Sequence, residues 1–156
     1  MSQTYVCPSA VPEAVTDWWS TLGQPRRSPS LDVLLIEDDR DIAEMYRRRL
    51  VSDGLQVAVA EDAETGLRLL REDRPAVLLL DIRLPGEDGY HVLQEVRADP
   101  ELARIPVLML SNYGEPSTIR RALEMGASEY LMKSSSTPAE VALRVRAYLT
   151  RGSDLQ

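Results

Sequence analysis

The chain has 156 residues, 44% hydrophobic and 28% charged, a composition typical of one soluble globular domain. One cysteine and one histidine exclude internal disulfides, zinc–thiolate clusters and multi-histidine metal sites. The net charge of −7 argues against nucleic-acid binding, which requires a basic face, and no apolar run is long enough to span a membrane. Since no signal peptide is present either, we expect a cytoplasmic protein with neither a membrane nor a nucleic-acid partner.

Residues 1–30 are expected to form an N-terminal arm. The arm contains four prolines, and Pro12 and Gly23 are suited to begin and end one short helix. Apolar residues follow a helical spacing within it, namely Val11, Val15, Trp18, Trp19 and Leu22. The last five residues of the arm are expected to form a linker. We expect a domain over 31–150 and a tail over 151–156.

From residue 31 onwards, short apolar runs alternate with amphipathic segments. The apolar runs predict five strands, at 31–36, 55–60, 76–80, 106–110 and 129–132. Apolar residues three and four positions apart predict a helix after each strand. The last helix is expected to begin at a capping box of Thr137 and Glu140, with Pro138 at its first position.

Five strand–helix units in about 120 residues predict an α/β fold with a five-stranded parallel sheet and right-handed crossovers. The run at 76–80 is apolar without alternation, which is typical of a central strand covered on both faces. Ligands of such sheets bind beyond the carboxyl ends of the strands, where the strand order reverses. The residues that follow each strand are therefore the candidates for function.

Charged and polar residues follow four of the five predicted strands. They are Glu37, Asp38 and Asp39 after the first strand, Asp81 after the third, Ser111 after the fourth and Lys133 after the fifth. Taken alone, an acidic triplet suits a helix N-cap and a single serine or lysine indicates nothing. Their shared position at one edge of a sheet is more informative, particularly because Lys133 is the only lysine of the chain.

This set of side chains predicts a particular chemistry. Clustered carboxylates repel one another unless a cation neutralises them, and oxygen ligands suit Mg²⁺. A carboxylate can accept a phosphoryl group as a nucleophile, and a lysine and a hydroxyl can hold the added oxygens. The pattern therefore predicts Mg²⁺-dependent phosphoryl transfer to an aspartate.

Four stretches resemble the receiver domain of bacterial two-component response regulators. These stretches are 33–39, 77–89, 106–111 and 126–133, in the order and spacing of that family. The resemblance covers about residues 31–150. It implies the receiver fold, a doubly wound, flavodoxin-like (βα)5 arrangement.

The resemblance also implies a role for individual residues. Asp81 is implied to be the phosphoacceptor and Lys133 the phosphoryl-binding lysine. Ser111 is implied to be the switch hydroxyl, and Tyr130 the aromatic residue that moves inward when Ser111 shifts. The implied Mg²⁺ site consists of Glu37, Asp38, Asp81 and the backbone carbonyl of Arg83.

In function, the resemblance implies a phosphoprotein of two-component signalling that is not an enzyme beyond its own phosphoryl uptake and loss. A sensor histidine kinase or a phosphotransfer protein would supply the phosphoryl group. The modified domain would repack the face made of its fourth helix, fifth strand and fifth helix, where a downstream protein or a second copy would bind. Because only six residues follow position 150, we expect a stand-alone receiver, with a phosphorelay intermediate as an alternative.

Two positions differ from the family pattern. Asn112 replaces the small residue, often alanine, that follows the switch hydroxyl, and Ser134 replaces the proline that follows the lysine through a cis bond. A cis bond before serine would cost ~2.5–4 kcal/mol instead of ~0.5–1, so we expect a trans bond or a shifted loop over 134–136, which would displace Lys133. These differences are the reason for keeping an alternative function, a phosphorylation-independent interaction or dimerisation module with the receiver fold.

Two further functions conflict with the residues at the strand ends. A haloacid-dehalogenase-like phosphatase needs a second aspartate two residues after its nucleophile, and Arg83 stands there and cannot serve as a general acid. A dinucleotide site needs a glycine-rich loop after the first strand, where the acidic triplet would instead repel a pyrophosphate.

Overall fold

The computed structural model describes residues 31–154, and it describes side chains as far as residue 150. Its five strands form one parallel sheet in the order β2-β1-β3-β4-β5. The strands are β1 (Val33–Ile36), β2 (Val57–Ala60), β3 (Val77–Asp81), β4 (Val107–Ser111) and β5 (Glu129–Met132). The order runs outward from β1 in both directions, so the sheet is doubly wound as the sequence predicts.

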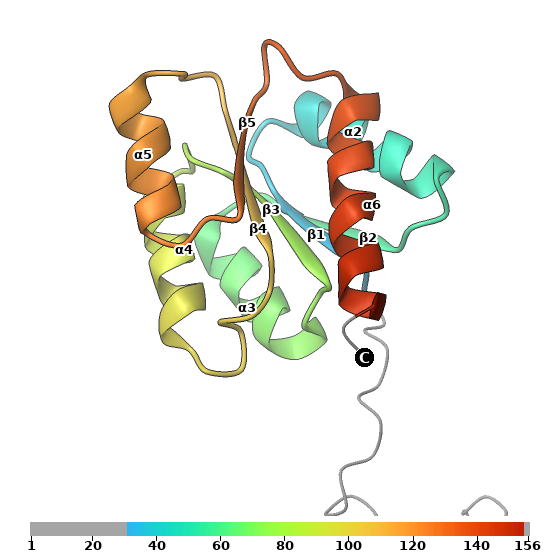
Figure 1. Ribbon diagram of the computed structural model, residues 1–156, viewed down its shortest axis with the longest axis horizontal. Coiled ribbons are helices and arrows are strands. Elements are labelled where there is room, and N and C mark those ends of the chain that lie inside the picture. The colour runs from blue at the N-terminus through green and yellow to red at the C-terminus, as the bar shows by residue number, and fades with distance from the viewer. Residues whose placement is uncertain (1–30, 155–156) are drawn as a thin grey trace, which may run out of the picture.

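Each strand is followed by a helix that returns the chain to the start of the next strand or leads to the end of the chain. The helices are α2 (Arg40–Ser52), α3 (Ala63–Asp73), α4 (Gly89–Ala98), α5 (Pro116–Glu124) and α6 (Pro138–Asp154). Helices α2 and α6 cover one face of the sheet, and α3, α4 and α5 cover the other (Figure 1). Within residues 31–154, none of the helices combines the length and the apolar character needed to cross a bilayer.

Successive residues of the central strands pack into two separate cores. In β3, Leu78 and Leu80 pack beneath α3, α4 and α5, whereas Val77 and Leu79 pack beneath α2 and α6. All residues of β1, β3 and β4 are buried, because helices cover both faces of the sheet. This arrangement explains why the run at 76–80 is continuously apolar.

Several predicted boundaries differ from the structure. Strand β1 begins two residues later than predicted, at Val33, and β3 and β4 each lie one residue later, at 77–81 and 107–111. Strand β2 begins two residues later than predicted, since the amide of Gln56 donates to the carboxylate of Asp32 at 2.8 Å. The last helix continues to Asp154, although its apolar spacing ends at Leu149. Apolar spacing marks only the part of a helix that packs on the sheet. The predicted arm over 1–30, with its short helix and linker, lies outside the described residues.

Side-chain caps fix the start of several helices close to the strand-end loops. Asp39 caps α2, Asp62 caps α3 and Asp88 caps α4, each through a carboxylate that accepts from backbone amides of the first turn. The predicted capping box of α6 is confirmed, with the Glu140 amide 3.1 Å from Thr137 Oγ1 and the Thr137 amide 3.3 Å from Glu140 Oε1.

Replacing Thr137 with alanine is expected to lower the free energy of unfolding by about 1 kcal/mol, the usual value of an N-cap hydroxyl. Urea unfolding followed by circular dichroism measures the loss. The matched control is Ser135→Ala, because that exposed serine takes no part in the capping box. Equal stability of the two variants would contradict a stabilising role for the capping box.

Candidate functional site

The residues predicted at the strand ends gather at one edge of the sheet. Ile36 pairs with Leu80 at the ends of β1 and β3, where the strand order reverses. The ends of β4 and β5 lie beside them. The resulting pocket has a volume of about 450 Å³. Its lining includes all of the predicted strand-end residues, namely Glu37, Asp38, Asp39, Asp81, Ser111 and Lys133.

Three carboxylates of the pocket could hold a metal ion. Oxygen atoms of Glu37, Asp38 and Asp81 lie within 4.8 Å of one another. Glu37 and Asp81 are only 1% and 5% exposed, whereas Asp38 faces solvent. An all-oxygen donor set with one side open to water fits Mg²⁺, which keeps several water ligands. The residues present therefore fit the predicted ion.

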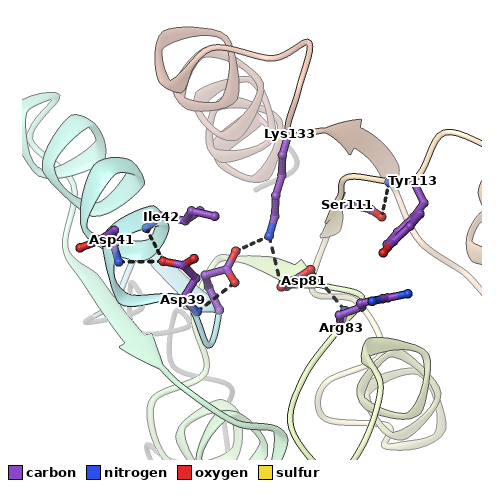
Figure 2. A network of polar contacts seen from close by, with 9 residues as sticks. Asp39, Asp41, Ile42, Asp81, Arg83, Ser111, Tyr113 and Lys133 are labelled. Carbon is purple, nitrogen blue, oxygen red and sulfur yellow. Dashed lines mark hydrogen bonds and ion pairs between the residues drawn. The ribbon is translucent and has the colours of Figure 1, made fainter.

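Lys133 lies among these carboxylates (Figure 2). Its Nζ atom is 3.2 Å from Asp81 Oδ2 and forms a close ion pair with Glu37 Oε1. The side chain is 9% exposed, so little water screens these contacts. Within the described part of the chain, the Lys133 ammonium is the only cationic group paired directly with Glu37 and Asp81.

Ser134 does not displace this lysine. No peptide bond within residues 31–154 is cis, so the trans bond predicted before Ser134 is confirmed. The amide of Lys133 donates to the carbonyl of Ser111 at 2.8 Å, which fastens the lysine backbone to the end of β4. Lys133 therefore reaches Glu37 and Asp81 even though the peptide bond before Ser134 is trans.

Burial and charge act against each other in the pocket. Burial raises the pKa of Glu37 to about 7, and the hydrogen bond with Asp81 acts in the same direction against the opposing Lys133 ammonium. Burial alone would lower the pKa of Lys133, but the two carboxylates outweigh it and raise that pKa. Lys133 therefore stays charged at neutral pH, while Glu37 binds a proton more readily than an exposed glutamate does.

The predicted switch residues contact the same loop residue. Ser111 is buried, and its Oγ atom accepts from the Tyr113 amide at 2.9 Å. The Tyr130 hydroxyl donates to the carbonyl of Tyr113 in a short contact. Tyr113 thus connects the hydroxyl at the end of β4 with the aromatic residue of β5.

One contact that lines the pocket, between Arg83 and Tyr113, was not predicted from the sequence. The guanidinium carbon of Arg83 lies 4.5 Å from the centre of the Tyr113 ring, and the two side chains stack (Figure 2). The Arg83 amide donates to Asp81 Oδ1 at 3.2 Å. Asn112 also lines the pocket and is exposed. No sequence pattern marks the stack, because it joins loops thirty residues apart.

Asp39 has a different role from its two neighbours. Its Oδ1 atom accepts from the amides of Asp41 at 3.0 Å and Ile42 at 3.1 Å (Figure 2). The carboxylate therefore caps α2, which is the ordinary role of an acidic residue before a helix. Only two residues of the acidic triplet belong to the candidate metal site.

The structural role of Gly89, the first residue of α4, was not predicted from the sequence either. A Cβ atom here would lie 2.8 Å from the Cα atom of Ile82 and still closer to the carbonyl oxygen of Asp81. Only glycine allows α4 to begin directly against the backbone of the candidate phosphoacceptor. No local sequence pattern marks this requirement, because the atoms that exclude a side chain belong to Asp81 and Ile82, eight and seven residues earlier.

Comparisons with known proteins agree with this geometry. The model of the response regulator receiver domain matches residues 33–146. The chain is 38% identical over 122 residues to the DNA-binding response regulator MtrA of Mycobacterium tuberculosis, covering 78% of this chain and 52% of MtrA. It is 40% identical over 124 residues to the transcriptional regulatory protein AfsQ1 of Streptomyces coelicolor, covering 80% and 52%. The chain spans about half the length of these curated relatives.

Solved structures show the same fold. A putative response regulator from Chloroflexus aurantiacus superposes with a TM-score of 0.72 at 34% identity, covering 77% of this chain and 98% of that one. The receiver domain of the Francisella response regulator 1452 gives a TM-score of 0.73 at 27% identity, covering 79% and 99%. The sheet order, the strand-end residues and these matches together show that the chain belongs to the response regulator receiver domain family.

Proposed function

We propose that this receiver accepts a phosphoryl group on Asp81 from the phosphohistidine of a sensor histidine kinase or a phosphotransfer protein. The observation that carries the proposal is the position of Lys133 beside both Asp81 and Glu37 in the pocket. In the transfer, the phosphorus–nitrogen bond of the donor breaks and a phosphorus–oxygen bond to the Asp81 carboxylate forms. The histidine nitrogen keeps the electron pair of the broken bond.

The surrounding residues have complementary roles. Glu37, Asp38, Asp81 and the backbone carbonyl of Arg83 would hold Mg²⁺. When bound, the ion neutralises the carboxylates and the oxygens of the transferred group. The Lys133 ammonium donates to a phosphoryl oxygen from the side of β5. The buried Ser111 hydroxyl offers a further hydrogen bond to the new group.

The contacts of Tyr113 support a switch that reaches the surface. A phosphoryl group on Asp81 gives the Ser111 hydroxyl an acceptor for its hydrogen, and a turn of the side chain toward that group would draw Oγ away from the Tyr113 amide, from which it accepts. A shift of that loop alters the contact between Tyr113 and Tyr130 on β5. We propose that the face formed by α5, β5 and α6 changes its binding of a downstream protein or a second copy in response.

An apolar patch on α5 supports this choice of face. Pro116, Ile119 and Leu123 contribute to it. Leu123 is 47% exposed, a large fraction for a leucine. The relative MtrA is named as DNA-binding, but the match covers only 52% of it, and a domain of this acidity is better suited to protein partners. We propose that the domain signals through protein contacts.

The test is the intact mass of the protein after incubation with acetyl phosphate and Mg²⁺. We expect one added phosphoryl group, and none when Mg²⁺ is removed with a chelator. If none is added, a beryllofluoride titration decides the matter. Binding would show a competent pocket that Asn112 closes to the small donor, whereas no binding would overturn the proposal in favour of a phosphorylation-independent module.

Replacing Asp38 with asparagine is expected to weaken Mg²⁺ binding at least about tenfold. Even residues outside the ligand shell contribute about 10–100-fold to metal affinity, so the loss of a charged ligand should have no smaller effect. Isothermal titration with Mg²⁺ measures the change. The matched control is Asp39→Asn, because asparagine also caps helices and the Asp39 carboxylate is directed at α2. Equal affinities would remove Asp38 from the metal site.

A further inference from the structure

Tyr90 joins the first turn of α4 to the first turn of α5. Its side chain is 6% exposed, and its hydroxyl donates to the carbonyl of Thr118 at 3.2 Å. The guanidinium carbon of Arg121 lies 3.9 Å from the centre of the Tyr90 ring. A hydrogen bond and a cation–π contact, both on the same tyrosine, therefore connect α4 with α5.

The residue before Tyr90 is fixed to the end of β3. A side chain at Gly89 has no room against the carbonyl of Asp81 and the Cα atom of Ile82. The carboxylate of Asp88 caps α4 through the amide of His91 at 3.1 Å, which holds the first turn in place. A displacement of the β3 end is therefore transmitted directly to the start of α4, because closely packed backbones do not deform independently.

We infer that Tyr90 is a positioning residue that couples the state of the Asp81 pocket to the position of α5. The connection runs from the backbone of Asp81 through Gly89 and Tyr90 to Thr118. Its residues differ from those of the route through Ser111, Tyr113 and Tyr130. The coupling rests on the proposed function, whereas the contacts by which Tyr90 connects α4 with α5 do not depend on it.

The hydroxyl of Tyr90 is the part of the side chain that distinguishes a positioning role from simple filling of the core. Tyr90 belongs to the core beneath α3, α4 and α5, and a phenylalanine would fill the same volume and keep the stack with Arg121. Tyr90→Phe therefore removes the hydrogen bond and nothing else. A residue that only filled the core would tolerate this change without any effect on α5.

The test is amide hydrogen exchange of the full chain, with and without Mg²⁺ and beryllofluoride. In Tyr90→Phe, we expect the amides of α5 to exchange roughly 2- to 10-fold faster, the range that one net hydrogen bond provides. We also expect the change in α5 exchange caused by beryllofluoride to fall below half of its wild-type size. Arg121→Gln, at an exposed position, should weaken the same connection without affecting folding.

The matched control is Tyr148→Phe. The Tyr148 hydroxyl also reaches a carbonyl, that of Ser128 at 3.5 Å, but from α6 on the opposite face of the sheet. We expect this variant to leave the exchange of α5 unchanged. An equal acceleration of α5 in both variants would indicate general destabilisation and overturn the inference.

The outcomes separate the inference from the proposed function. If the α5 amides of Tyr90→Phe exchange at the wild-type rate, Tyr90 does not hold α5 against α4. If they exchange faster but beryllofluoride changes their exchange as much as in the wild type, Tyr90 holds α5 but does not couple it to the Asp81 pocket. If the wild-type protein does not bind beryllofluoride, the proposed function and the coupling fail together, and the comparison without ligand still decides whether Tyr90 holds α5.

Discussion

Replacing Asp81 with asparagine is expected to abolish phosphoryl uptake and leave the fold intact. The amide has no carboxylate oxygen to attack phosphorus, and Asp81 is the carboxylate that stands at the end of β3, beside β4 and within reach of Lys133. Intact mass after treatment with acetyl phosphate and Mg²⁺ measures uptake. Asp39→Asn, an identical chemical change at a helix cap in the same pocket, should retain it.

The stability of this variant provides a second check. Asp81 is buried beside Glu37 and Asp38, and carboxylates at such short separation repel one another. Removing one charge relieves that repulsion, and Lys133 keeps Glu37 as its partner. We therefore expect a free energy of unfolding no lower than that of the natural chain. Persisting uptake in a well-folded Asp81→Asn protein would contradict the assigned role.

Replacing Gly89 with alanine is expected to lower the free energy of unfolding by about 3 kcal/mol or more. The added Cβ atom would collide with the backbone of Asp81 and Ile82, which cannot move aside like the end of a flexible side chain. Helix α4 would have to shift as a whole. Urea unfolding measures the loss, and phosphoryl uptake should fall as well, because the end of β3 is displaced.

Gly86 provides the comparison for this variant. It has a φ angle of +80°, and a Cβ atom there would meet nothing within 4 Å. Gly86→Ala should therefore lower stability only by the cost of the left-handed conformation, about 1–2 kcal/mol. If Gly89→Ala lowered the free energy of unfolding no more than Gly86→Ala does, α4 would not pack closely against the Asp81 backbone. The connection through Tyr90 would then lack its starting point.

The fold and the main site residues were predictable for a specific physical reason. The carboxyl ends of parallel strands meet at one edge, so residues as distant in sequence as Glu37 and Lys133 could be placed together from the strand pattern alone. The unbroken apolar run at 76–80 predicted the central strand, which carries Asp81 at its end. The capping box of Thr137 and Glu140 involves only local contacts and was equally accessible.

Contacts between loops or between helices could not be predicted in the same way. The Arg83–Tyr113 stack and the Tyr90–Thr118 hydrogen bond join segments about thirty residues apart. Their formation depends on the distance between β3 and β4 and on the angle at which α4 and α5 pack. Neither quantity is encoded in hydrophobic periodicity, which specifies elements but not their separation.

The most direct test of the central claim is the location of the phosphoryl group. After reaction with acetyl phosphate and Mg²⁺, borohydride reduces an acyl phosphate to an alcohol, and peptide mass mapping identifies the altered residue. We predict modification at Asp81 and at no other carboxylate. Modification of Glu37, Asp38 or Asp39 in its place would contradict the assignment of the pocket, even if the protein took up one phosphoryl group.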